Sequence, residues 1–132
     1  MKFRIWDEES KIFVDLTKYY INYLGDIFYF EDMDNEFLKC KNCIIQYSSG
    51  KKDLHGKDIY EGDIVKYTSW NCEWEDMQNK REYIDAVELT NGKFYPIPFT
   101  ENCDDGFYSY GVKNLEIIGN IFENRYLLCG RL

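Results

Sequence analysis

The sequence lacks any long hydrophobic run, and this absence excludes a membrane-spanning helix. Its wholly apolar stretches are only a few residues long, as at residues 43–45. The N-terminus also lacks the apolar segment of a signal peptide, because the charged residues Lys2, Arg4 and Asp7 interrupt it. We therefore expect an intracellular protein with no membrane contact.

Basic residues are too few to give the chain a net positive charge. Its 132 residues include 16 Lys and Arg against 24 Asp and Glu, which leaves a formal net charge of −8. Attraction to nucleic-acid phosphates is therefore not expected from the net charge alone. A hydrophobic content of 45% also excludes a disordered tail and indicates a globular fold with its own core.

Helix-favouring residues are scarce as well. Alanine occurs once, at Ala86, and proline twice, whereas Phe, Trp and Tyr make up 18% of the residues. Aromatic residues favour strands and alanine favours helices. The composition therefore predicts a mainly β protein.

Turn signals divide the chain into about nine or ten short expected strands. The clearest is Asn91-Gly92, the preferred hairpin dipeptide, between residues 84–89 and 94–99. Gly119 predicts a bulge within the last strand. Residues 15–20 are expected to form a helical turn, and residues 31–36, 50–57 and 68–82 to form loops. The other expected strands are residues 3–6 and 12–14 as a hairpin, 21–24 and 27–30 around Gly25-Asp26, one within 37–47, 59–67, 107–112 and 115–122.

The fold class that we predict is a set of short-stranded antiparallel sheets in two regions. Residues 1–47 form an N-terminal region with a β-hairpin, and residues 48–132 form a C-terminal region with an SH3-like small barrel. The boundary is the polar segment 48–57, and the alternative is one continuous domain.

The five cysteines are odd in number, which argues against a disulfide framework and for reduced thiols. Cys40 and Cys43 have the C-x-x-C spacing of half a zinc site. The other half would need Cys72 and Cys103, which are single residues about thirty positions apart, so we expect small buried hydrophobes. The sequence predicts no metal and no cofactor.

The chain shows no catalytic constellation. Its single histidine, His55, lies in a glycine-containing segment where an exposed turn residue is expected. The carboxylates Asp32, Asp34 and Glu36 resemble a calcium loop, but the EF-hand glycine and final glutamate are replaced. Nucleotide-binding glycine motifs are absent too. We therefore predict that the protein is not an enzyme.

Two nucleic-acid hypotheses remain as alternatives. Lys51, Lys52 and Lys57 lie near Tyr47 in the sequence, and basic residues beside aromatic ones can bind single strands. Conversely, acidic clusters at residues 31–36, 73–76 and 101–105 could imitate a DNA backbone against a host enzyme. The acidity is also sufficiently explained by solubility.

Three segments resemble one family, the YopX-like phage and prophage proteins. They lie in the family's order and span residues 2 to 124, with the central segment the most specific. The segments are Lys2-Phe3-Arg4-Ile5-Trp6-Asp7 with Lys11; Gln46-Tyr47 with Asp53-Leu54-His55-Gly56-Lys57-Asp58-Ile59-Tyr60-Glu61-Gly62-Asp63-Ile64-Val65; and Leu115-Glu116-Ile117-Ile118-Gly119-Asn120-Ile121-Phe122-Glu123-Asn124.

The resemblance implies a β-rich protein of phages or prophages that acts in the bacterial cytoplasm and self-associates. It supplies no catalytic residue. The chain departs from the family at Ser48-Ser49, where a Thr-Gly pair is usual, and at Arg125, where a proline is common. The motif residues that we expect to be structural are Trp6, Gly56, Tyr60, Glu61, Gly62, Asp63, Gly119 and Asn120.

The function predicted from these observations is a non-enzymatic phage or prophage accessory protein that works through protein contacts. Trp70 and Trp74 lie in a polar segment, so they are candidates for an interface, and the alternative is that they cover the barrel's open end. The first expected partner is another copy of the chain, in a homo-oligomer, and the second is a host or phage protein. The alternative is a nucleic-acid-linked module, by direct binding or by mimicry.

Overall fold

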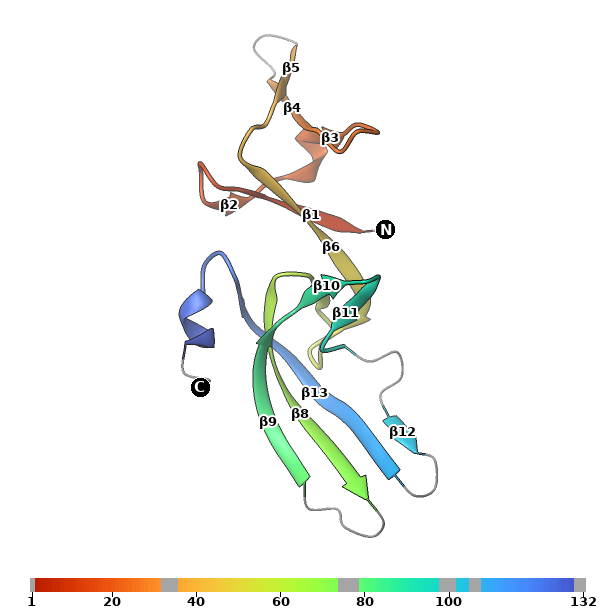
Figure 1. Ribbon diagram of the computed structural model, residues 1–132. Helices are drawn as coiled ribbons and strands as arrows, with labels where there is room; N and C mark the ends of the chain where they lie inside the picture. The colour runs from red at the N-terminus through yellow and green to blue at the C-terminus, as the bar shows by residue number, and fades with distance from the viewer. Residues whose placement is uncertain (1, 32–35, 74–78, 98–101, 105–107, 130–132) are drawn as a thin grey trace. The chain divides into compact units, whose positions relative to one another are not determined.

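The computed structural model describes residues 2–31, 36–73, 79–97, 102–104 and 108–129. The chain consists of two compact units, Met1–Tyr47 (unit 1) and Ser48–Leu132 (unit 2). Strands dominate both of them (Figure 1), so the predicted mainly β class is confirmed. Among the described residues, no helix is both long and apolar enough to cross a membrane.

Unit 1 begins with the predicted hairpin, which is confirmed. Strand β1 (Phe3–Asp7) pairs antiparallel with β2 (Ile12–Phe13) and, on its other side, with the first half of β6 (Cys43–Lys52). Ile5 and Trp6 are buried, and the Trp6 ring meets that of Phe13 edge to face at 4.9 Å. The hairpin therefore carries the apolar core of this unit.

A second, three-stranded sheet completes unit 1. It contains β3 (Tyr19–Ile21), β4 (Ile27–Glu31) and β5 (Glu36–Lys39), with β4 in the middle. The turn at Gly25, where φ is +87°, joins β3 to β4, as Gly25-Asp26 predicts. The expected helical turn is also present as the 3-10 helix η1 (Leu16–Lys18).

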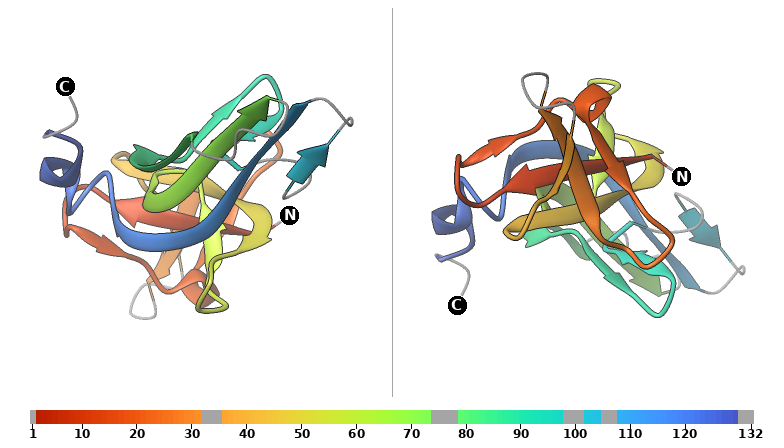
Figure 2. Two further views of the ribbon diagram at one scale, coloured as in Figure 1. Left: turned by 90° about the horizontal axis from the view of Figure 1, so that it is seen from below. Right: turned by 90° about the horizontal axis from the view of Figure 1, so that it is seen from above.

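Unit 2 is organised around a curled, half-barrel sheet in which β8 (Asp63–Glu73) lies between β9 (Asn79–Ala86) and β13 (Tyr108–Asn120). Figure 2 shows the curved course of β13, which has two register shifts against β8. The short β12 (Asn102–Asp104) pairs with the outer side of β13. An SH3-like barrel within this unit stays a prediction.

The core of unit 2 lies against this sheet and includes a short strand outside it. Ile59, Val65, Tyr67 and Val87 are buried together. Ile59 belongs to β7 (Asp58–Tyr60), which pairs with the second half of β6. Partly buried hydrophobic residues surround this cluster: Phe94, Ile97, Val112, Leu115 and Ile117.

The Asn91-Gly92 hairpin is confirmed. It joins β10 (Glu88–Thr90) to β11 (Lys93–Tyr95), and both turn residues have positive φ, +52° and +77°. Asn and Gly tolerate this conformation, which explains why the dipeptide is such a reliable signal. The described chain ends with the 3-10 helix η2 (Arg125–Leu128).

The prediction of a loop over residues 68–82 is wrong. β8 continues to Glu73 and β9 begins at Asn79, with the backbone of Thr68 opposite Glu82. Polar side chains do not prevent a strand when backbone hydrogen bonds are made on both sides. The expected loop at residues 50–57 is also shorter, because β6 runs to Lys52, and the single strand expected within residues 37–47 is two strands, β5 and β6.

Candidate functional site

The central motif forms a tight corner before β8. The amide of Tyr60 donates to Asp63 Oδ2 at 2.8 Å, and Gly62 has the positive φ, +85°, that the reversal requires. Gly62 N donates to the carbonyl of Val87, and Ile121 N donates to the carbonyl of Gly62, both at 2.8 Å. Glu61 occupies the same turn, half-buried. The corner therefore holds together the ends of three strand segments, which is a structural role.

Asp53 anchors the loop that carries Gly56, whose φ is +81°. Its buried carboxylate accepts from the amides of His55 and Lys57 at 2.9 Å and from Ile117 at 3.1 Å. Burial acts to raise the Asp53 pKa, but the three amide donors outweigh it and hold the pKa below its usual value. The sequence analysis includes Asp53 in the segment that resembles the family but predicts no role for it, although an Asp at the start of a turn commonly accepts from the amides that follow it.

Gly119 and Asn120 build the predicted bulge, which is confirmed by the register shift between Ile117 and Gly119. A Cβ on Gly119 would lie 2.6 Å from Asn124 Oδ1, so a side chain has no room there. The Asn120 side chain accepts from the amides of Phe122 and Glu123 at 3.0 Å. Both residues therefore shape the turn that follows β13.

The remaining residues selected from the sequence have different outcomes. Trp6 is buried in the core of unit 1. The backbone of Trp70 lies in β8, opposite Gly111 and Lys80, while its side chain lies outside the described part. Trp74 lies outside the described residues altogether. The interface assigned to the two tryptophans stays a prediction.

His55 contacts Glu116, one of the residues that line a polar cavity of unit 2. Its Nε2 lies 3.0 Å from Glu116 Oε2, and Lys66 Nζ lies 3.5 Å from Glu82 Oε2. Glu116, Lys66 and Glu82 line a cavity of 210 Å³. All four side chains are well exposed to solvent, which is typical of surface ion pairs rather than of a tuned acid–base site.

Tyr67 is a buried tyrosine of unit 2 whose pKa is raised by its surroundings. Its hydroxyl donates to Asp85 Oδ2 at 2.5 Å, and its ring stacks on Tyr83. Burial, followed by the hydrogen bond to Asp85, raises the Tyr67 pKa well above its usual value. The phenol therefore stays protonated at neutral pH and serves as a hydrogen-bond donor within the core.

The nucleic-acid candidates are only partly described. Lys51, Lys52 and Lys57 are exposed, but Lys52 Nζ lies 3.1 Å from Asp58 and is partly neutralised by it. Asp32 and Asp34 lie outside the described residues, and the side chain of Glu36 does as well. The acidic clusters at 73–76 and 101–105 also fall largely outside them. Both nucleic-acid hypotheses stay predictions.

Unit 1 exposes a group of aromatic rings on one face of the β3–β4–β5 sheet, which we call the aromatic face. Strand alternation places these four residues on the same side: Tyr20, Phe28, Phe30 and Phe37. Tyr20 stacks on Phe28 at 5.1 Å and meets Phe37 edge to face at 4.8 Å, and Phe30 lies 5.4 Å from Phe37. Phe37 is 56% exposed and Tyr20 is 42% exposed. These rings contact one another yet remain open to solvent.

The C-x-x-C segment connects β5 to β6 in unit 1. Cys40 and Cys43 are joined by a disulfide, so the expectation of reduced thiols is wrong for this pair. The turn brings their Cα atoms to 5.8 Å, which is within the range for a bridge. Cys129 has a free thiol and is exposed. The side chains of Cys72 and Cys103 lie outside the described part.

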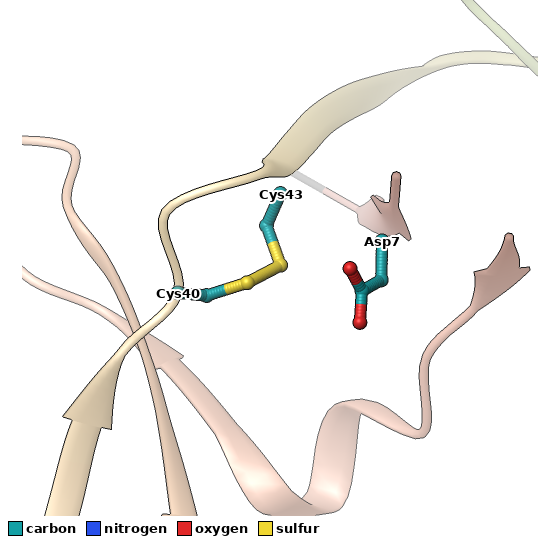
Figure 3. Close-up of side chains that lie close together, drawn as sticks. All are labelled: Asp7, Cys40 and Cys43. Carbon is teal, nitrogen blue, oxygen red and sulfur yellow. A yellow bond between two sulfur atoms is a disulfide. The ribbon is translucent and has the colours of Figure 1, made fainter. Parts of the chain in front are cut away.

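The carboxylate of Asp7 lies beside this disulfide (Figure 3). Its oxygen and the two sulfur atoms lie within 4.8 Å of one another. A cavity of 350 Å³ opens next to them, lined also by Tyr19 and Tyr29. Burial raises the Tyr19 pKa, and the charge of Asp7 and the neighbouring Tyr29 add to that effect.

Comparison with known proteins decides the family. The sequence profile described as "YopX protein" matches residues 2–129. The chain belongs to the YopX family. The match assigns no activity to the chain, but it confirms the family resemblance from which the residues of the central motif were selected.

Two solved structures share the YopX-family fold. The crystal structure of protein yopX from Bacillus subtilis is 20% identical, with 95% of each chain covered and a TM-score of 0.56. That of protein EF1440 from Enterococcus faecalis is 22% identical, with 96% of each chain covered and a TM-score of 0.51. At this identity the likeness establishes the fold alone. No curated protein matches the chain.

Proposed function

We propose that this YopX-family chain is a non-enzymatic phage or prophage accessory protein of the bacterial cytoplasm that works by self-association through the aromatic face of unit 1. The observation that carries the proposal is the exposure of Tyr20 and Phe37, which are held in contact with Phe28 and Phe30. Clustered exposed aromatic rings are characteristic of protein interfaces.

A second copy of the chain is the occupant that we propose. A two-fold axis places the same surface of each copy against the other, so an apolar face is complementary to itself without any further adaptation. Aromatic side chains give large buried areas with little loss of conformational entropy. The family resemblance, which implies self-association, agrees with this choice.

The net charge of −8 sets the expected salt dependence. Two copies with the same negative charge repel one another at low ionic strength, and salt screens that repulsion. Self-association through an apolar face should therefore strengthen as salt is raised. Binding to nucleic-acid phosphates should instead weaken steeply.

The non-enzymatic part of the proposal is supported by the positions of the titratable groups. The single histidine, His55, is exposed and faces Glu116. Tyr67 is bound to Asp85 inside the core. Neither arrangement matches a base held against a nucleophile in a protected site.

Sedimentation velocity across the micromolar concentration range tests the proposal. We expect a reversible oligomer in the wild type, and we expect Phe37→Ser to weaken the self-association affinity by about tenfold or more, the effect of losing a central aromatic contact. Tyr23→Ser is the matched control, because Tyr23 lies in the same unit, is 95% exposed and stands outside the aromatic face. It should leave the oligomer unchanged.

A monomer at every concentration and salt would overturn self-association. A pull-down from bacterial lysate, with and without nuclease, then separates the other hypotheses. A protein retained after nuclease treatment and lost with Phe37→Ser would assign the aromatic face to a host or phage partner. Capture that depends on nucleic acid and on Lys51 and Lys57 would favour the nucleic-acid-linked alternative.

A further inference from the structure

Asp7, Cys40 and Cys43 come from separate parts of the sequence but meet at one end of the β1–β6 pair. Asp7 is the last residue of β1 and is the direct register partner of Cys43, the first residue of β6. Cys40 lies three residues earlier, across the turn. Two sulfur atoms and one carboxylate oxygen are thereby brought within 4.8 Å of one another (Figure 3).

We propose that reduction of the Cys40–Cys43 disulfide converts this cluster into a binding site for a borderline-soft divalent metal ion, for which zinc is the best match. Two thiolates and a carboxylate are ligands that zinc accepts. In a tetrahedral site with zinc–ligand distances of about 2.0–2.3 Å, ligand atoms lie roughly 3.3–3.8 Å apart. To reach that geometry, the two sulfur atoms must move apart once the disulfide is reduced, while the carboxylate oxygen is already within 4.8 Å of them.

The carboxylate of Asp7 is held in place by its own turn. Asp7 Oδ1 accepts from the amide of Glu9 at 2.9 Å, and Oδ2 accepts from the Ser10 hydroxyl at 2.8 Å. The Cys40 amide donates to the carbonyl of Ile27 at 2.8 Å, which fixes the other side of the site. Such surrounding hydrogen bonds orient metal ligands and raise affinity.

Access and charge are also suitable. The 350 Å³ cavity beside the cluster leaves space for an entering ion and for a water molecule at the fourth position. Lys39 and Lys41 line the same cavity. Two thiolates and one carboxylate carry three negative charges against two on the ion. The lysines offset this excess only in part, because Lys39 is paired with Asp26 at 3.4 Å and Glu9 also lines the cavity.

The disulfide and the metal site exclude each other. Reduction by an external dithiol breaks the S–S bond, gives each cysteine sulfur one electron and one proton, and converts the reductant into its own disulfide. The metal then replaces the two thiol protons, which are released to solvent. The proposed site is therefore loaded only in reducing conditions.

The test uses the full chain with Cys72, Cys103 and Cys129 all changed to serine, which leaves Cys40 and Cys43 as the sole cysteines. The protein is reduced with dithiothreitol, freed of it without oxygen and titrated with Co²⁺, then with Zn²⁺. We expect one equivalent of cobalt, thiolate-to-cobalt charge-transfer absorption, and displacement by zinc. The oxidised protein should bind none.

Two further variants separate ligation from folding. Asp7→Asn removes the carboxylate charge and should weaken zinc binding by at least about tenfold, the smallest effect expected even for an outer partner. Tyr23→Ser is the control, because Tyr23 lies in the same unit, is 95% exposed and is outside the cluster, so it should leave the zinc affinity unchanged. Thermal unfolding of both apo variants checks that the hairpin remains folded.

Three results would overturn the proposal. They are the absence of charge-transfer absorption in the reduced serine variant, loss of binding on replacing Cys72 or Cys103 in the wild-type background, and equal zinc affinities of the wild type and Asp7→Asn.

Discussion

The two units use their distinctive residues in opposite ways. In unit 2, two carboxylates of the central motif, Asp53 and Asp63, are buried among backbone amides. In unit 1, Tyr20 and Phe37 are exposed on the aromatic face, and Asp7 lies beside a cysteine pair. The central motif of unit 2 therefore builds the fold, whereas the exposed aromatic rings and the carboxylate beside the cysteine pair lie in unit 1.

Among the substitutions that test this contrast between the units, the one with the largest expected loss of stability lies in the core of unit 2. Ile59 is fully buried and packs in the cluster with Val65 and Val87. Ile59→Ala should lower the free energy of unfolding by about 2–5 kcal/mol, because it leaves a cavity. Urea unfolding measures this loss. A change below about 1 kcal/mol would mean that the motif segment is not part of the stabilising core.

Gly119→Ala is expected to have the next largest effect. The new Cβ would collide with the Asn124 side chain, and overpacking of this kind costs about 1–3 kcal/mol. The double variant with Asn124→Gly should cost less than the sum of the two single variants, because the whole side chain that the new Cβ would meet is removed. A double-mutant cycle by urea unfolding checks this, and strict additivity would contradict the contact.

Asp53→Asn should lower the free energy of unfolding by about 1 kcal/mol at neutral pH, since Asn cannot accept from all three amides. This loss should depend on pH. The Asp53 pKa is lowered by folding, so its contribution is fully present above the usual value of 3.8 and is lost as pH falls through the lowered pKa. Unfolding of both proteins at neutral pH and at about pH 3 and below should show the difference shrinking. A difference in unfolding free energy that increased as the pH fell would contradict the lowered pKa of Asp53.

Tyr23→Ser is expected to have the smallest effect. The side chain is 95% exposed in the turn between β3 and β4, so the stability should change by no more than about 0.5 kcal/mol. Thermal unfolding measures this. A larger loss would mean that unit 1 also depends on its exposed aromatic residues for stability, which would remove the contrast between the units.

The sequence predicted the features of this fold that depend on neighbouring residues. The Asn91-Gly92 turn, the hairpin after Asp7 and the bulge at Gly119 were all recoverable, because each is determined by local backbone preferences. The helical turn capped by Asp15 belongs to the same class.

What could not be predicted depends on partners far away in the chain. The polar half of β8 is a strand because β9 and β13 pair with it on both sides. Asp53 is structural because it binds an amide 64 residues later, at Ile117. Asp7 joins Cys43 only through the register of two strands. No local pattern contains this information, so the cysteine spacing indicated half a zinc site but did not show that Asp7 lies beside it.

β13 is the last strand of the described part of the chain, and this position affects how the protein folds during its synthesis. The sheets of unit 1 pair within the first 47 residues, so they have all their partners once that segment has emerged from the ribosome. β8 must wait for β13, whose pairing ends at Asn120, and the loop at Asp53 waits for Ile117. Unit 2 therefore closes from its C-terminal end, and a ribosome stalled before that point would hold a finished unit 1 beside an open sheet.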